Sequence, residues 1–270
     1  MTQAVRWKAN SLCCRFLHGY RYPVLFIACC PKSASTWFSH LLAKAIPGYR
    51  YLHPEEFRRP DGTGCDITPA VVDAFAGKFA VGRAHTPATA ANVAMMDQAF
   101  GKYMFCMRDM RDVAASLYYH VHRYPRSAFI DTGETRQLPW QSLSPDVLTY
   151  SKEKCLDVII AELMPALTTF VRQWLKVVPQ QENCLLLRYE DITQDTEAEV
   201  CRVLRFFDIP VSQRRIAHAV DRYHRSRLCA GTWKFRKGEA GNWRQELTGR
   251  QQRVMLDLCD DVLPSGQDAA

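Results

Sequence analysis

Four short apolar runs alternate with longer stretches of helical spacing along most of the chain. The runs are residues 24–30, 78–83, 102–107 and 183–188. Short runs that are apolar throughout are typical of strands buried on both faces. Because helical stretches separate the runs, they predict βαβ units and a parallel sheet. The fold class that we expect is therefore α/β, with a central parallel sheet flanked by helices.

Five helices are expected between and after these strands. Their predicted ranges are 35–45, 88–100, 110–120, 153–178 with a break at Pro165, and 196–207 before the stop at Pro210. Residues 50–70 and 122–150 are instead polar or contain Pro and Gly. We expect loops there, of the kind that cover active sites.

The composition is that of a globular protein. Of the 270 residues, 47% are apolar and 23% are charged, which argues against a disordered chain. We expect one domain over 1–270, with a core at about 24–245 and peripheral segments at 1–22 and in the C-terminal helix and tail. The net charge of +7 suits an anionic ligand but is too diffuse to indicate nucleic acid. No run of 18 apolar residues occurs, so we expect no membrane span.

Cysteine usage points to a reducing compartment. The chain has 11 cysteines and no C-x-x-C pair. Several lie inside the apolar runs, where a thiol serves as a small buried hydrophobic group. The N-terminal residues show no convincing secretory cleavage site. We therefore expect free thiols and a cytoplasmic protein.

The segment 30–37, CPKSASTW, follows the first predicted strand and begins a helix. This geometry directs backbone N–H groups and the helix dipole at one spot, which suits a phosphate. Lys32 adds a positive charge, and Ser33, Ser35 and Thr36 add hydroxyl groups. The segment contains no glycine, so it does not match the P-loop of ATP-binding proteins. The alternative is a Ser/Thr-rich N-cap of an unremarkable helix.

Two further segments offer phosphate-binding groups. Arg108 lies at a predicted strand end and Ser116 about two helical turns later, so both could reach one phosphate. The alternative for Arg108 is a surface ion pair with Asp109 or Asp112. Near the C-terminus, Arg236, Lys237 and Gly238 form a basic loop with a permissive glycine, or else a solvated charge pair.

Three blocks of the chain resemble, in order, those of the PAPS-dependent sulfotransferases, in their soluble, cytosolic-type branch. PAPS is the sulfuryl donor 3′-phosphoadenosine 5′-phosphosulfate. The blocks are PKSASTW at 31–37, MRDMRDVAASLYYH at 107–120 and FRKGEAGNW at 235–243, and the resemblance spans about 24–245. It implies a P-loop-like strand–loop–helix for the 5′-phosphosulfate and a second block for the 3′-phosphate.

The resemblance also implies residue roles at the donor. The donor-binding set would be Lys32, Ser33, Ala34, Ser35, Thr36, Trp37, Arg108, Ser116, Tyr189, Arg236, Lys237 and Gly238. Tyr189 belongs to a Y-E-D stretch whose Tyr lies near the adenine base. Trp37 stacks on the adenine or, as an aromatic at helical spacing, packs in the core.

The segment GRAHTP at 82–87 resembles the K-T-H-x-P element of the same family. This implies that His85 is the general base that deprotonates the acceptor, a task that suits a neutral imidazole. Arg83 stands where the family often has Lys, and with Lys32 it would stabilise charge. A lone His after a strand is otherwise a loop residue. PAP is expected as the second product, and no metal is expected.

The chain departs from the family pattern at three further positions. Ala34 replaces the loop glycine, Ser35 replaces a Thr but keeps the hydroxyl, and Asn242 replaces an Asp. A short dimerisation motif of many animal members is absent, so the oligomeric state is open. The acceptor is expected to be a small molecule with a hydroxyl or amine. The matching region 117–140 would help to line its pocket, through Tyr118, Tyr119, His120, His122, Tyr124 and Phe129.

Two other functions fit part of the sequence. A nucleotide or small-molecule kinase with a divergent phosphate loop would need Mg²⁺ and a carboxylate at a strand end, such as Asp109. A non-catalytic nucleotide-binding protein would keep the fold without turnover, and the changes at Ala34 and Asn242 are its support.

Overall fold

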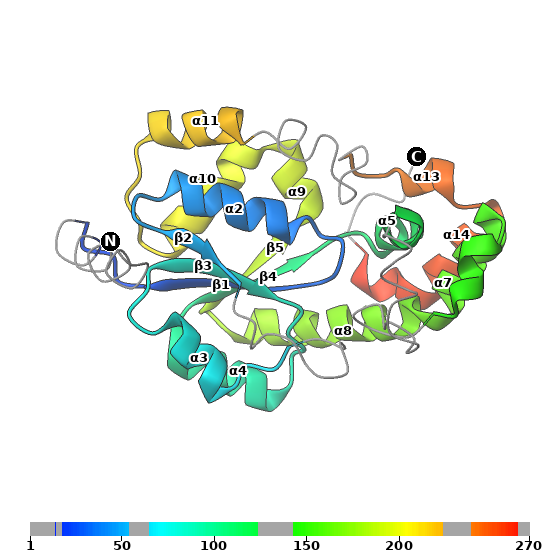
Figure 1. Cartoon of the computed structure of the whole chain (residues 1–270), viewed down its shortest axis with the longest axis horizontal. Helices are drawn as coiled ribbons and strands as arrows, with labels where there is room; N and C mark the ends of the chain where they lie inside the picture. Colours follow the sequence, from blue (N-terminus) through cyan, green and yellow to red (C-terminus); the bar gives the residue numbers. More distant parts are fainter. Residues whose placement is uncertain (1–13, 15–17, 54–64, 124–142, 224–238, 264–270) are drawn as a thin grey trace.

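The computed structural model describes residues 14, 18–53, 65–123, 143–223 and 239–263 (Figure 1). Its five strands are β1 (Val24–Cys29), β2 (Arg50–Leu52), β3 (Ala80–Ala84), β4 (Tyr103–Met107) and β5 (Cys184–Arg188). They form one sheet in the order β2-β3-β1-β4-β5, and every neighbouring pair is parallel. The predicted α/β class is confirmed. Only the short β2 was not expected, because its three residues are exposed or half-buried and give no continuous apolar signal.

The described α-helices are α2 (Ser35–Ala45), α3 (Pro69–Phe75), α4 (Ala90–Phe100), α5 (Met110–Arg123), α7 (Lys152–Glu162), α8 (Met164–Val177), α9 (Tyr189–Gln194), α10 (Thr196–Phe206), α11 (Gln213–Arg222), α13 (Trp243–Glu246) and α14 (Gly249–Cys259). The five predicted helix ranges all contain helices, whereas α3, α9, α11 and α13 were not predicted. The predicted helix 153–178 is two helices that meet at Leu163, because Pro165 belongs to the first turn of α8, where its missing N–H is tolerated. The predicted loop 50–70 contains β2 and the start of α3.

Helices cover both faces of the sheet (Figure 1). In that view α2, α9, α10 and α11 lie above the sheet and α3, α4 and α8 below it, while α5, α7, α13 and α14 lie beyond one end. Successive side chains of a strand point to opposite faces of the sheet. Leu25, Ile27 and Cys29 of β1 therefore pack in an upper hydrophobic cluster, whereas Phe26 and the residues two positions before and after it pack in a lower cluster. Burial on both faces explains why the strands are apolar throughout.

The core is larger than the predicted range of about 24–245. Cys14 and Tyr20 are buried in the upper cluster, and Met255, Cys259 and Val262 are buried in the lower one. The segments expected to be peripheral therefore contribute to the core. The burial of α14 was hard to predict, since only Gln251, Met255 and Cys259 of this helix are buried, while Val254 and Leu256 are exposed.

The nine cysteines among the described residues form no disulfide, and all but Cys201 are buried. Burial raises the pKa of Cys155 to about 11, so its thiol stays protonated at neutral pH. In the part of the chain that the structure describes, no helix combines the length and apolar character needed to cross a membrane.

The order of the strands locates a ligand site. After β1 the chain moves to β2 at one edge of the sheet, whereas after β4 it moves to β5 at the other edge. Ligands of open parallel sheets bind outside the carboxyl ends of the strands at such a switch point. The loop after β1 and the turn after β4 meet here, where the backbone N–H of Cys30 donates to the carbonyl of Cys106 at 2.8 Å.

Gly82 in β3 is required by close packing. A Cβ atom there would lie 2.5 Å from Cζ of Phe75, a ring that is buried between the sheet and α4. We expect Gly82→Ala to lower the free energy of unfolding by about 1–3 kcal/mol, as overpacking of a core does. Chemical denaturation measures this, with Gly249→Ala as the control, since a Cβ at Gly249 meets only Arg253 at 3.8 Å. Equal stability of the two variants would contradict the prediction.

Candidate functional site

The loop after β1 is held by its own hydrogen bonds. Lys32 and Ala34 adopt left-handed backbone conformations, with φ of 63° and 59°. The hydroxyl of Ser33 donates to the carbonyl of Cys30 at 2.7 Å, and the thiol of Cys106 donates to the carbonyl of Ser33 at 3.6 Å. These contacts fix the loop onto the carboxyl ends of β1 and β4.

Helix α2 starts without a side-chain cap. Its N-cap residue is Ala34, whose methyl side chain offers no acceptor to the N–H groups of the first turn. The alternative of a Ser/Thr-capped helix is therefore wrong. The first N–H groups of a helix have no partner within the helix and carry the positive end of its dipole, which favours an anion. Ser35 is buried and Thr36 is half-buried in this turn.

Lys32 reaches from this loop to α5. Its Nζ lies 3.3 Å from Nδ1 of His120, and Lys32 is half-buried. The loop and the later turns of α5 are therefore in contact. Of the residues predicted to line the acceptor pocket, Tyr118 lies against His122, with ring centroids 4.3 Å apart and the rings tilted by 39°. Tyr124 and Phe129 lie outside the described residues.

Arg108 lies in the turn between β4 and α5 and is buried. Its Nη1 donates to the carbonyl of Lys32 at 3.4 Å, and Nη2 donates to the carbonyl of Glu239 and to Asp112, both at 3.1 Å. The guanidinium lies over the ring of Tyr189, 4.1 Å from its centroid. The alternative of an ion pair with Asp112 is thus present, but the pair is buried rather than on the surface.

One donor of Arg108 is unused. Its Nε–H is buried and has no hydrogen-bond partner among the described residues. A buried donor without a partner is unfavourable and calls for an explanation, for which a bound acceptor is the simplest. A guanidinium presents its donors in a planar fork that fits phosphate. The site around Arg108 therefore fits an anionic phosphate group.

The positions of the other candidate donor-binding residues support a role in binding to different degrees. Ser116 lies on α5 and is half-buried, and Tyr189 is buried at the start of α9 beneath Arg108. Trp37 is 8% exposed within the upper cluster, and its indole N–H donates to the carbonyl of Tyr223 at 2.8 Å. These contacts favour the packing interpretation of Trp37. Arg236, Lys237 and Gly238 lie outside the described residues.

Sequence reasoning gave no role to Asp112 beyond a possible surface pair. In the structure its carboxylate accepts hydrogen bonds from the backbone N–H groups of Gly241 and Trp243, at 2.8 and 2.9 Å, in addition to Arg108. The position of Asp112 four residues after Arg108, in the second block, was the one feature of the sequence that could have indicated its contact with Arg108.

His85 lies directly after β3, with its ring held against the end of β1. Its Nδ1–H donates to the backbone carbonyl of Cys29 at 2.8 Å, and the thiol of Cys29 lies 3.5 Å from the same nitrogen. Because Nδ1 carries the proton, the lone pair of the neutral ring is on Nε2. His85 thus has the tautomer that a general base needs.

The surroundings of His85 keep it neutral. Burial lowers its pKa from 6.5 to about 3, and the positive charges of Arg83 and Lys32 add to this effect. Arg83, at the end of β3, is half-buried. Burial alone would lower the pKa of Arg83, but Cys29 and Tyr51 raise it above its ordinary value, so the guanidinium stays charged.

The lowered pKa of His85 predicts the shape of a pH profile. The unprotonated imidazole predominates above about pH 3, so the basic form is already complete between pH 5 and 8. We expect kcat/KM for the donor to show no loss on acidification through pH 6.5, when the acceptor is a phenol that does not titrate in this range. An acidic limb centred near pH 6.5 that His85→Asn abolishes would contradict the assigned environment.

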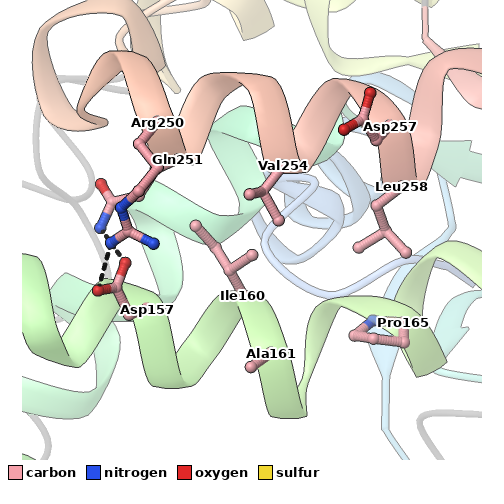
Figure 2. A pocket seen from close by; sticks show the side chains of 9 residues that line it. All are labelled: Asp157, Ile160, Ala161, Pro165, Arg250, Gln251, Val254, Asp257 and Leu258. Carbon is pink, nitrogen blue, oxygen red and sulfur yellow. Dashed lines mark hydrogen bonds and ion pairs between the residues drawn. The ribbon is translucent and has the colours of Figure 1, made fainter.

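A pocket lies elsewhere, between α7 and α14 (Figure 2). The residues that line it are Asp157, Ile160, Ala161, Pro165, Arg250, Gln251, Val254, Asp257 and Leu258. Arg250 and Gln251 close one end of it by donating to Asp157, at 2.5 and 2.7 Å (Figure 2). None of the predicted site residues lines this pocket. The candidate site is therefore the edge of the sheet around the loop after β1, His85 and Arg108.

Within the described residues, no group of three or more His, Cys, Asp or Glu side chains is arranged to hold a metal ion. Asp109, the carboxylate that a kinase could use, is fully engaged. Its two oxygens accept from Nε and Nη2 of Arg111, the latter at 2.8 Å.

A family model described as "Sulfotransferase domain" matches residues 23–265. The chain is 26% identical over 97 residues to sulfotransferase 6B1 of Danio rerio, a match that covers 33% of this chain and 33% of that protein. The aligned part thus spans about a third of this curated relative.

Two solved structures with PAP bound share the fold. Mouse sulfotransferase SULT7A1, complexed with PAP, aligns with a TM-score of 0.63 and 15% identity over 88% of this chain and 84% of its own. Retinol dehydratase, in complex with androsterone and inactive cofactor PAP, aligns with a TM-score of 0.60 and 17% identity over 98% of this chain and 87% of its own.

Proposed function

Because the chain belongs to the sulfotransferase domain family, we propose that it transfers a sulfuryl group from PAPS to a hydroxyl or amine of a small-molecule acceptor. PAP would be the second product. The observation that carries the proposal is the meeting of three features at one sheet edge. They are an uncapped helix start with Lys32, the neutral base His85 and a buried Arg108 with an unused donor.

The donor would be held by residues of the first two blocks. We assign the 5′-phosphosulfate to the loop of Lys32, Ser33 and Ala34 and to the first turn of α2, with Ser35 and Thr36. The unused Nε–H of Arg108 supports a phosphate beside it, and Ser116 lies on the helix that Arg108 precedes. PAP in the mouse sulfotransferase and in retinol dehydratase supports the same nucleotide here.

We also assign a role in donor binding to Arg236, Lys237 and Gly238 of the third block. They would complete the set of residues that bind PAPS. When bound, PAPS supplies an activated sulfuryl group that the acceptor oxygen or nitrogen can take up as PAP departs.

The chemistry of this chain would be proton removal and charge stabilisation. His85 takes the acceptor proton on Nε2, while its Nδ1–H bond to the Cys29 carbonyl keeps the ring oriented. Lys32 and the N–H groups at the start of α2 neutralise negative charge that grows on the departing phosphate oxygen. Arg83 stays charged beside His85 and contributes to the same field.

The contacts of Asp109 speak against the kinase alternative. A kinase would use a carboxylate at this strand end to hold Mg²⁺, whereas both oxygens of Asp109 are bonded to Arg111. The non-catalytic alternative is disfavoured because Ala34 already adopts the left-handed conformation that a glycine would supply.

The wider description of the protein is also a proposal. We propose one domain over 1–270, a cytoplasmic location and a small acceptor, since the thiols described are free and Lys32 contacts His120, which lies in the region that resembles the acceptor pocket.

The test of the proposed function is turnover without metal. Purified protein, PAPS and a panel of phenols, alcohols and amines are incubated with excess EDTA, and release of PAP is followed together with the sulfated product. We expect product from at least one acceptor in equal amount with PAP. Phosphorylated product from ATP and Mg²⁺, with no sulfated product from any acceptor, would overturn the proposal.

A further inference from the structure

We propose that Asp112 is a positioning residue, which holds Arg108 and the segment 239–243 in one arrangement at the donor site. This inference rests on the proposed function, because the arrangement affects donor binding only if Arg108 contacts the donor. It adds a role for a residue that touches neither the reacting atoms nor the acceptor.

Three hydrogen-bond donors from two parts of the chain converge on Asp112. One of its oxygens accepts from Nη2 of Arg108 at 3.1 Å and from the N–H of Gly241 at 2.8 Å, and the other accepts from the N–H of Trp243 at 2.9 Å. The side chain of Asp112 has no exposed surface. A buried carboxylate requires such donors, so the carboxylate and its three partners depend on one another.

The segment 239–243 is also joined to Arg108 directly. Nη2 of Arg108 donates to the carbonyl of Glu239 at 3.1 Å, and Nδ2 of Asn242 donates to the same carbonyl at 2.8 Å. The Arg111 guanidinium lies over the ring of Trp243, 3.9 Å from its centroid. The start of α5 and the segment 239–243 therefore form one connected unit, with Asp112 at its centre.

Asp112 also determines where Arg108 can donate. The guanidinium is planar, and its plane is fixed by the Tyr189 ring on one face and by the bonds of Nη2 to Asp112 and Glu239. Fixing Nη2 fixes the direction of the unused Nε–H. We therefore infer that Asp112 acts on the donor through Arg108.

The variant Asp112→Asn tests this role by ligand affinity. An amide offers one acceptor oxygen and two N–H donors where the carboxylate offers two acceptors, so at least one of the three bonds to Asp112 is lost. We expect the Kd for PAP, measured by calorimetry, to rise about tenfold or more. The Kd for adenosine 5′-monophosphate, which lacks the 3′-phosphate, should change by less than about threefold. A merely structural role would weaken both ligands alike.

Two further variants complete the design. Glu199→Gln is the matched control, because it removes a buried carboxylate with its own partner, Arg202 at 2.7 Å, in α10. We expect it to leave both affinities unchanged. In the double variant of Asp112→Asn with Arg108→Gln, PAP should bind no more weakly than in Arg108→Gln alone. Additive losses, or equal losses for both ligands, would overturn the inference.

Hydrogen exchange of the unmodified protein tests the same claim if Asp112→Asn does not fold. PAP should slow amide exchange in a peptide covering 239–247, whereas adenosine 5′-monophosphate should not. If PAP binds but does not slow exchange in this peptide, the inference about Asp112 is overturned and the proposed function is not. Failure of the unmodified protein to bind PAP at all would overturn the proposed function as well.

Discussion

The variant His85→Asn is expected to lower kcat by about 10²–10⁴-fold, the usual contribution of a general base. The amide of Asn can still donate to the Cys29 carbonyl, which His85 bonds at 2.8 Å, but it cannot take up a proton. The fold and the donor loop should therefore persist. We expect the Kd for PAP to stay within about threefold of the wild-type value.

Steady-state kinetics with PAPS and the best acceptor measure this result, and calorimetry with PAP measures binding. His218→Asn is the control, because His218 is exposed on α11 and lies outside the proposed site. A kcat within about tenfold of wild type would remove His85 from the mechanism. Loss of PAP binding in parallel with kcat would show instead that His85 supports the donor site rather than the proton transfer.

The variant Lys32→Met is expected to lower kcat/KM for PAPS by about 10²–10³-fold, the scale of losing one stabilising group at a developing negative charge. Met has similar length and no charge, and, like Lys, it is unbranched at Cβ, so the left-handed backbone at residue 32, with φ of 63°, places the same demand on both side chains. The affinity for PAP should fall less than kcat/KM, because the charge on the bridging oxygen grows during the reaction.

Lys44→Met controls for net charge, since Lys44 is an exposed residue in the last turn of α2. It should leave the kinetics unchanged, and Lys32→Arg should recover part of the loss by restoring the positive charge. A fall of less than about tenfold in Lys32→Met would contradict the assignment of Lys32 to the leaving group.

Most of the fold could be predicted from the apolar pattern. β1 and α2 lie where the sequence placed them to within one residue, because a strand buried on both faces is apolar throughout and the apolar residues of α2 recur at helical spacing. β2, and the contribution of α14 to the core, could not be predicted in this way. β2 has only three residues, none of them buried, and α14 is largely polar.

Features of the site that are formed by residues adjacent in the sequence could also be predicted, but contacts between residues distant in the sequence could not. The strand–loop–helix at 30–37 and the position of His85 directly after β3 follow from residues adjacent in the sequence. The contacts of Asp112 with Gly241 and Trp243 join positions 129 and 131 residues apart, and the contact of Lys32 with His120 joins positions 88 apart. Such pairs depend on strand order, which no local pattern specifies.

The measurement that tests the account most directly is calorimetric titration of the protein with PAP in EDTA, compared with ATP plus Mg²⁺. Wild type and Arg108→Gln are titrated side by side. We predict PAP binding without metal that is stronger than the binding of ATP with Mg²⁺, and a large loss of PAP affinity in Arg108→Gln. Preference for ATP with Mg²⁺, or PAP binding that Arg108→Gln leaves unchanged, would contradict the central claim that this sheet edge is a donor site for sulfuryl transfer.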